Sequence, residues 1–290
     1  MGMKIRSYRA EDAAALAAGG RALGRRETAV SLHRELNSLP KMGGRVWVAA
    51  LNGQPIGYAS VIPLPGLPHL LELDGFIASS QQRRGYGSAL LTAVLAALSG
   101  SGKTVTYAVG SHDEPATLFL RAHQFTIEHE EWQMVWQAEE RLAGKTAVLP
   151  PPLTIRTLPQ PQAIAQFIAL YDRSFSPHPW HQPYTPDEVA AFLASPADLH
   201  FLYANKEPIG FAWLRLAGET AEIEPVGVVP EWQGRGNGRF LLQHTLSYLV
   251  RHGCREVHLG VWQTNHAAIQ LYQRVGFRHT TSRYFYGRLA

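Results

Sequence analysis

The chain has almost no cysteine and no long apolar run. Its 290 residues include one cysteine, Cys254, which excludes an intramolecular disulfide and a cysteine-rich metal site. No segment reaches the roughly 18 to 20 consecutive apolar residues that span a bilayer. The first residues lead into a strand pattern, and no signal-type apolar stretch follows them. We therefore expect a cytoplasmic protein without a membrane partner and without a bound metal.

An excess of charge of one sign is also missing. The formal net charge is only +4 at pH 7, and the basic residues are scattered along the chain. This charge permits nucleic-acid binding but does not require it, so we do not expect a nucleic-acid partner. The sequence contains no indication of the oligomeric state.

The sequence repeats itself at offsets of 150 to 153 residues. Four matching segments keep the same order: 4–7 with 154–157, 54–59 with 207–212, 82–87 with 233–238, and 105–109 with 257–261. Two copies of about 140 residues fit the chain length. We predict an N-terminal domain at residues 1–140, a Pro-rich linker at 141–152 and a C-terminal domain at 153–290.

Each copy shows the same predicted order of elements. A strand (5–8, 155–158) and a helical region (13–22, 162–175) precede a hairpin (46–50 with 56–61, and 201–204 with 209–216). The Asn52-Gly53 turn is a strong hairpin signal. A strand (70–77, 221–229), a Gly-rich loop, a helix (88–98, 239–251), a strand (105–109, 257–261), a short helix and a terminal strand follow. This order predicts an α/β fold, in which each copy has a mainly antiparallel sheet flanked by helices.

The Gly-rich loop of the C-terminal copy carries the strongest functional signal. It contains the segment Gln233-Gly234-Arg235-Gly236-Asn237-Gly238 and leads into a helix at Arg239. Glycines let the backbone approach a ligand closely, and the first amides of a helix lack internal partners at its positive end. The loop therefore predicts a pyrophosphate site. It matches neither a Walker A loop nor Gly-x-Gly-x-x-Gly. The alternative is an ordinary strand-to-helix turn. Recurrence of the Gly-rich pattern in both copies argues against this alternative.

The pattern Val-x-Pro-x-x-Gln-x-x-Gly-x-Gly resembles the acetyl-CoA signature of the GNAT superfamily of N-acetyltransferases. The resemblance implies that the strand before the loop splays from its neighbour, and that Val226, Gly227 and Val228 face the pantetheine and acetyl groups. Residues Gln233, Gly234, Arg235, Gly236, Asn237, Gly238 and Arg239 would then bind the phosphates of acetyl-CoA. Corresponding positions in the N-terminal copy are Gly75-Phe76-Ile77 and Arg83, Arg84, Gly85, Tyr86, Gly87 and Ser88, with Ser79 in place of the proline.

A second segment resembles the GNAT motif Asn-x-x-Ala-x-x-x-Tyr-x-x-x-Gly-Phe. It runs from Asn265 through Tyr272 to Gly276-Phe277. The resemblance implies that Asn265 contacts the cofactor and that Tyr272 donates a proton to the leaving thiolate of CoA. The alternative is that the Tyr272 ring only packs beside Phe277.

Acetyl transfer to an amine also requires a base. Glu222 and Glu224 precede the strand residues that would face pantetheine, and alternation along a strand predicts that both carboxyl groups point the same way. Partial burial would raise the pKa of such a carboxyl group. The alternatives are a solvated strand face, or a histidine as the base. The candidate histidines are His178, His181 and His266.

The two copies are not equivalent in these positions. The N-terminal copy has Asp113 and Leu120 where the C-terminal copy has Asn265 and Tyr272, and Glu72 and Asp74 remain as carboxylates. We predict that the N-terminal copy is catalytically weak or silent, although its glycines still allow it to bind acetyl-CoA.

The acceptor is less well defined than the donor. A Pro-rich segment with aromatic and imidazole groups, residues 175–184, is a candidate lining of an acceptor pocket, or alternatively a rigid connector. The layout resembles the mycothiol synthase type of tandem GNAT protein, whose C-terminal half acetylates a small amino-sugar thiol. We expect transfer to a primary amine of a small molecule or peptide, by direct attack in a ternary complex. The competing hypotheses are a non-catalytic acetyl-CoA-binding or scaffold protein and a nucleic-acid-binding protein.

Overall fold

A computed structural model describes residues 2–110, 113–138, 152–176 and 181–290. Within these ranges no helix combines the length and apolar character of a membrane span. The predicted linker at 141–152 lies outside the described residues except for Pro152, as do residues 177–180 of the predicted acceptor segment.

The chain forms two compact units. One comprises Met1–Glu128 with Phe285–Ala290, and the other comprises His129–Tyr284. Strand order is β1-β2-β3-β4-β5-β12-β6 in the first unit and β12-β6-β11-β10-β9-β8-β7 in the second. Strands β6 (Thr126–Gln137) and β12 (Arg278–Leu289) therefore contribute residues to both units.

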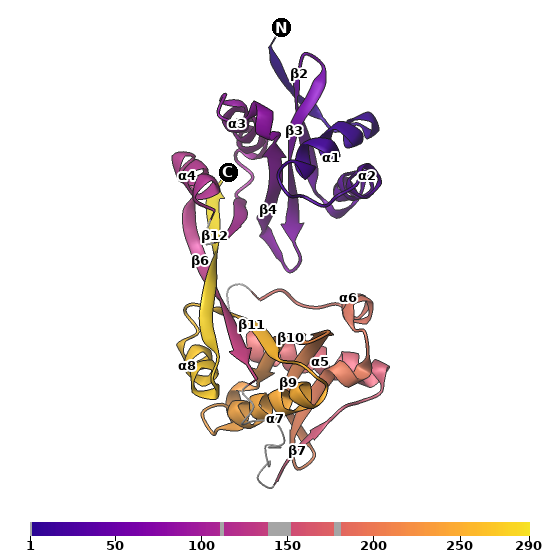
Figure 1. Ribbon diagram of the computed structural model, residues 1–290, viewed down its shortest axis with the longest axis vertical. Coiled ribbons are helices and arrows are strands. Elements are labelled where there is room, and N and C mark those ends of the chain that lie inside the picture. Colours follow the sequence, from indigo (N-terminus) through magenta and orange to yellow (C-terminus); the bar gives the residue numbers. More distant parts are fainter. Residues whose placement is uncertain (1, 111–112, 139–151, 177–180) are drawn as a thin grey trace. The chain divides into compact units, whose positions relative to one another are not determined.

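The first unit follows the predicted order of elements (Figure 1). It contains β1 (Met3–Ser7), α1 (Ala13–Arg21), α2 (Ala29–Ser38), β2 (Arg45–Leu51), β3 (Gln54–Leu64), β4 (Leu67–Ile77), α3 (Tyr86–Leu98), β5 (Thr104–Gly110) and α4 (Glu114–Ala122). Asn52 and Gly53 both have positive φ, 52° and 87°, as the Asn-Gly hairpin signal predicts. Helices α1 and α2 lie on one face of the sheet and α3 lies on the other.

The second unit repeats this arrangement. Its elements are β7 (Leu153–Arg156), α5 (Gln160–Phe175), α6 (Pro186–Phe192), β8 (Leu199–Ala204), β9 (Glu207–Ala217), β10 (Thr220–Val228), α7 (Asn237–Arg251), β11 (Glu256–Trp262) and α8 (His266–Val275). Apart from the pairs that involve β12, the strand pairs are antiparallel except β4–β5 and β10–β11, which are parallel. The predicted fold class, two mainly antiparallel sheets flanked by helices, is confirmed.

Two helices are additional to the predicted elements. Thr28 is the N-cap of α2, and its side chain accepts a hydrogen bond from the Ser31 amide. Thr185 caps α6 in the same way. Threonine caps of this kind satisfy amides that have no partner within the helix. The apolar pattern underlying α2 is short, because only Leu32 and Leu36 are buried.

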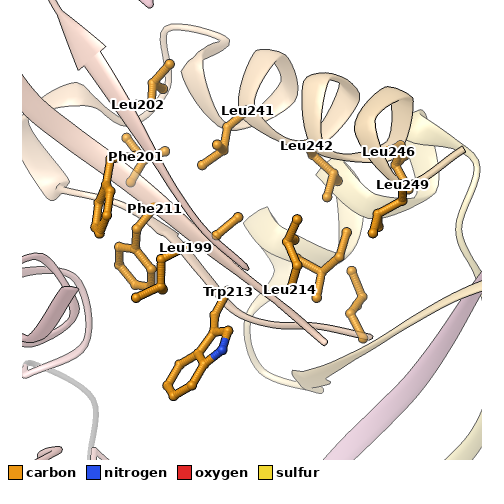
Figure 2. Close-up of a cluster of buried hydrophobic side chains, with 14 of the residues drawn as sticks. Leu199, Phe201, Leu202, Phe211, Trp213, Leu214, Leu241, Leu242, Leu246 and Leu249 are labelled. Carbon is orange, nitrogen blue, oxygen red and sulfur yellow. The ribbon is translucent and has the colours of Figure 1, made fainter. Parts of the chain in front are cut away.

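The core of the second unit has one layer on each face of its sheet. Leu241, Leu242, Leu246 and Leu249 of α7 point toward the sheet, whereas Trp213 extends from the face away from α7 (Figure 2). Trp213 instead contacts Phe167 of α5, with ring centroids 5.1 Å apart. Alternation along β9 therefore supplies both layers, since successive strand residues point to opposite faces.

The second half of β6 belongs to this core although it comes from the N-terminal copy. It pairs antiparallel with β11, from Glu256 opposite Gln137 to Trp262 opposite Glu131. The side chain of Met134 is fully buried and Trp136 is 3% exposed. The C-terminal copy thus depends on a strand that precedes it in the chain.

Replacing Trp136 tests this dependence. We expect Trp136→Ala to lower the free energy of unfolding by about 3 to 5 kcal/mol, because a large aromatic side chain is removed from a packed core. Urea-induced unfolding measures the change. The control is Gln137→Ala, an exposed neighbour on the same strand. Equal effects of the two substitutions would show that this half of β6 is not part of the core.

Candidate active site

The strand before each Gly-rich loop separates from its parallel neighbour. Strand β10 pairs with β11 only from Thr220 to Glu222, which opposes His258. From Val226 to Val228 it remains paired with β9 on its other edge. The same separation occurs in the first unit, where β4 pairs with β5 only as far as Glu72. In the described residues, the backbone of β10 at 226–228 therefore has one edge without a paired strand, which is the geometry that the GNAT resemblance implies for pantetheine.

The loop after β10 ends in a helix N-terminus without a side-chain cap. Gly234 and Gly236 have positive φ, 72° and 80°, a conformation that glycine adopts without strain. Gly236 is the N-cap of α7, and the amide of Phe240 donates to the Gly236 carbonyl at 3.1 Å. The backbone amides of Asn237, Gly238 and Arg239 precede the first intrahelical bond. They are therefore available to bind an anion at the positive end of the helix.

Two predicted cofactor residues use their side chains to brace the loop. The amide group of Gln233 donates to the carbonyl of Val228 at 2.8 Å, and that of Asn237 donates to the carbonyl of Trp232 at 2.8 Å. Gln82 makes the same bond to Ile77 in the N-terminal copy. The side chains of Gln233 and Asn237 are therefore engaged within the protein.

The loop of the N-terminal copy has the same form. Gly85 caps α3 with φ of 81° and without a side-chain cap, and the amide of Ala89 donates to its carbonyl. Arg83 has a φ of 61° at the position of Gly234, a conformation that costs a residue with a Cβ free energy. Ser88, in the first turn of α3, contacts His123 at 2.9 Å.

The predicted carboxylates lie at a β-bulge. Glu224 and Pro225 of β10 both oppose Trp213 of β9, because the register shifts between Ile223 and Val226. Strict alternation ends at this bulge. The carboxyl groups of Glu222 and Glu224 nevertheless interact, since each contributes to the pKa shift of the other.

The two carboxyl groups differ in their electrostatics. Burial, followed by the charge of Glu131 and the hydrogen bond to Glu222, raises the pKa of Glu224 to about 8. Burial alone would also raise the pKa of Glu222, but Arg215 outweighs it and holds this pKa below its usual value. Arg215 Nε donates to Glu222 Oε2 at 2.8 Å. Near neutral pH the pair therefore holds one proton at Glu224 and one negative charge at Glu222.

Tyr272 lies on α8 and is 6% exposed. Burial, with a contribution from the charge of Glu224, raises the pKa of its phenol above the usual value. The phenol consequently keeps its proton at physiological pH and can donate it. Its ring also packs against Phe277, at 5.9 Å between centroids, so the packing role and the predicted catalytic role coexist.

Asn265 is the N-cap of α8. Its side-chain oxygen accepts a hydrogen bond from the amide of Ala268 at 3.2 Å, and Asp113 makes the same bond to Ala116 in α4. The shared position is therefore explained by helix capping, and the cofactor contact assigned to Asn265 stays a prediction.

Aromatic side chains surround the acid pair on the α5 side. Tyr171 contacts Tyr184 with ring centroids 4.8 Å apart, and the charge of Glu224 contributes to raising the pKa of both phenols, after burial. Tyr184 in turn lies near Trp213, at 6.1 Å. The described part of the predicted 175–184 segment thus lies close to the predicted base.

The candidate histidines occupy different places. His181 pairs with Asp172 at 3.1 Å and stacks near Tyr171. His266 is exposed at the first turn of α8, and His178 lies outside the described residues. Over the described ranges, no group of three or more His, Cys, Asp or Glu side chains is arranged to hold a metal ion.

The N-terminal copy has its corresponding carboxylate tied to an arginine. Asp74 accepts two hydrogen bonds from Arg25 Nη2, at 2.6 and 2.7 Å, and one from the hydroxyl of Tyr58 at 2.7 Å. The guanidinium of Arg25 also lies over the rings of Tyr58 and Phe76. Leu120, at the position of Tyr272, is buried and has no proton to donate.

Three residues at these sites were missed by the sequence analysis: Arg25, Glu131 and Arg215. Glu131 is on β6, 91 positions before Glu222 in the chain, and only strand pairing brings the two into one unit. Arg25 and Arg215 lie outside every recognisable motif. No spacing in the sequence relates Arg25 or Glu131 to the acids on which they act, whereas Arg215 directly opposes Glu222 across the β9–β10 hairpin.

The chain matches a known family along most of its length. The profile of the Acetyltransferase (GNAT) family matches residues 21–125 and 164–277. The mycothiol acetyltransferase of Clavibacter michiganensis subsp. michiganensis is 32% identical over 244 residues, covering 80% of this chain and 76% of that protein. The mycothiol acetyltransferase of Nocardia farcinica is 29% identical over 244 residues, covering 79% and 78%.

Solved structures show the same fold over the whole chain. A GCN5-related N-acetyltransferase from Sphaerobacter thermophilus has a TM-score of 0.70 at 19% identity, covering 99% of this chain and 95% of its own. A tandem GNAT protein from the clavulanic acid biosynthesis pathway has a TM-score of 0.68 at 16% identity, covering 99% and 98%. The two family matches, the relatives and the site geometry agree: the chain belongs to the GNAT acetyltransferase family and is an acetyl-CoA-dependent N-acetyltransferase with two GNAT domains.

Proposed function

We propose that the C-terminal copy transfers an acetyl group to the primary amine of a small molecule or peptide, by direct attack in a ternary complex. The observation that supports this most is the acid pair, Glu222 and Glu224, together with the neutral phenol of Tyr272. An amine must lose a proton before it attacks, and the departing thiolate must gain one. This copy has a group for each transfer.

Acetyl-CoA supplies the thioester that the amine attacks. The free amides at the start of α7 and the guanidinium of Arg235 bind its phosphates, and the open edge of β10 at 226–228 aligns the pantetheine. The Glu222–Glu224 pair accepts the proton of the amine once it has released the proton held at Glu224. Tyr272 donates its proton to the sulfur. The relatives are named for mycothiol, so the amino-sugar thiol acceptor of that reaction is the first to test among small amines.

We propose that the N-terminal copy binds acetyl-CoA without catalysing transfer. Its loop keeps the uncapped helix start at Gly85, which supports cofactor binding. Its carboxylate, Asp74, is occupied by Arg25 and Tyr58, and Leu120 replaces the phenol. The non-catalytic hypothesis thus applies to this copy.

Charge reversal in the two loops tests which copy binds the cofactor. Arg235 and Arg84 occupy equivalent, exposed positions. We expect Arg235→Glu to weaken acetyl-CoA binding at the C-terminal site by about tenfold or more, because a charge-assisted phosphate contact becomes a repulsion. Isothermal titration measures each site, and Arg84→Glu is the matched variant. If neither substitution changes binding, the phosphates do not lie at these loops.

Removal of the Tyr272 hydroxyl tests the proposed acid. We expect Tyr272→Phe to lower kcat by about 10²- to 10⁴-fold, the usual range for general acid catalysis, while binding of acetyl-CoA stays unchanged. The ring and its packing against Phe277 are retained, so the thermal midpoint serves as the folding control. A kcat within twofold of the unsubstituted enzyme would exclude Tyr272 as the acid.

The pH dependence tests the proposed base. We expect kcat/KM to rise with pH up to about 8, the pKa of Glu224, because the pair must lose its proton to act. Glu224→Gln should abolish this limb along with most of the activity.

Stability should change in the opposite direction. The pKa of Glu224 is higher in the folded than in the unfolded protein, so the protonated form favours folding. Its contribution is complete below the usual carboxyl pKa and is lost as pH rises toward about 8. The unfolding midpoints of the parent protein and of Glu224→Gln should therefore converge or cross over this pH range.

A kcat/KM profile of the parent protein that is flat from pH 6 to 9 would contradict the assignment of Glu224 as the base.

A further inference from the structure

Glu131 lies on the face of the second unit's sheet that carries the acid pair. In the β6–β11 pairing, Glu131 opposes Trp262 and Gln133 opposes Gly260, and directly opposed residues share a face. The residues between them along β6 alternate to the other face, where Met134 is fully buried in the core. Glu131 therefore points away from α7, toward the face that Glu222 and His258 share.

The carboxyl group of Glu131 is held at the level of Glu224. Glu222 pairs with His258 in parallel register, so Glu224 and Gly260, each two residues further on, lie at the same level. A Cβ on Gly260 would lie 2.8 Å from Glu131 Oε1, which shows that the carboxyl group lies directly over this glycine. The side-chain amide of Gln133 donates a hydrogen bond to the same oxygen.

Strands β10 and β11 have already separated at this level. The carboxyl group of Glu131 therefore stands across the opening from Glu224. The two groups interact: the charge of Glu131 is the largest contribution to the raised pKa of Glu224 after burial. Burial raises the pKa of Glu131 itself, against the charge of Arg283 and the hydrogen bond from Gln133.

Other titratable groups also face this point from the surrounding elements. They are Glu222 on β10, Arg215 on β9, Tyr171 on α5, Tyr184 before α6, and Tyr272 on α8, with His258 on β11 acting on Glu222. The described groups at this point thus include three carboxyl groups, those of Glu131, Glu222 and Glu224. Arg215 is hydrogen-bonded to Glu222, and the charge of Arg283 acts on Glu131.

We propose that Glu131, supplied by the last strand of the N-terminal copy, is a positioning residue of the C-terminal active site that makes its acceptor end selective for an amine arriving as an ammonium ion. The inference rests on the proposed transfer to an amine. The negative charge of Glu131 attracts the cationic acceptor. It also keeps the proton of the acid pair at Glu224 until the acceptor is bound. The N-terminal copy therefore contributes to catalysis through one side chain, although it carries out no transfer itself.

The test compares Glu131→Gln with Glu130→Gln in the full-length protein. Glu130 is the adjacent residue on the opposite face of β6, where it accepts hydrogen bonds from Trp132 and Ser282. Both substitutions remove one negative charge from the same strand, and only the first removes it from the opening. Steady-state rates with a small primary amine are measured from pH 6 to 9.5. They give kcat, KM and the acid limb of the kcat/KM profile for each variant.

We expect Glu131→Gln to shift the acid limb of kcat/KM to lower pH by about one unit, because a like charge beside Glu224 is removed. The KM of the amine should rise about tenfold at pH 7, in keeping with the loss of one charge–charge contact in a partly buried site. Glu130→Gln should leave both unchanged. Superimposable profiles for the two variants would overturn the inference while leaving amine acetylation intact, whereas an inactive parent protein would overturn both.

Gly260→Ala provides a second variant that keeps the charge. Its Cβ would lie too close to Glu131 Oε1, so the carboxyl group must move from its place. We expect a shift of the acid limb in the same direction as for Glu131→Gln, with acetyl-CoA binding retained as a check on folding. A limb unchanged from that of the parent protein would also overturn the inference.

Discussion

The separation of β10 from β11 after the Glu222–His258 pair is the constraint on which the site depends. A strand that stayed paired would use the backbone of 226–228 in a ladder, and no edge would remain for an extended ligand. The separation coincides with the bulge at Glu224-Pro225. Bulges re-aim side chains, so this irregularity accounts for the placement of Glu224. It is not required for the separation itself, because β4 leaves β5 after Glu72 without a bulge at that level. The start of α7, which has no side-chain cap, follows the same strand after the Gly-rich loop.

The two copies share the backbone part of this design and differ in the side chains that perform chemistry. Gln82 and Gln233 make the same brace, and Asp113 and Asn265 make the same cap. These interactions support a loop and a helix in either copy, whatever the chemistry. The carboxyl group in the N-terminal copy is bound by an arginine, and that in the C-terminal copy keeps a proton near neutral pH. The two copies therefore share backbone geometry without sharing the surroundings of this carboxyl group.

The sharing of strands gives the N-terminal copy a structural role in the C-terminal one. Strand β6 begins in the first unit and ends in the core of the second, and β12 runs the other way. Each unit's sheet is completed by a strand that belongs to the other copy in the sequence. Mutations that inactivate one copy's chemistry can accumulate while its last strand remains necessary, because burial of Met134 and Trp136 constrains that strand independently of catalysis.

The sequence by itself determined the elements that depend on local patterns. The Asn52-Gly53 turn, the Gly234 and Gly236 loop, the order of strands and helices, and the loss of the phenol at Leu120 could all be predicted, because each is set by residues close together in the chain. The helices α2 and α6 could not, since their apolar faces are too short to stand out.

Tertiary structure decided how the acids behave. Glu222 and Glu224 look alike in the sequence, and their pKa values are separated by burial of Glu224 together with the approach of Glu131 and Arg215 from other strands. The same holds for Arg25, whose contact with Asp74 lies across 49 residues. Electrostatic effects depend on distance in space and on burial, and spacing along the chain does not carry these distances. The exchanged strand β6 brings Glu131 to Glu224, and packing within one unit brings Arg25 to Asp74.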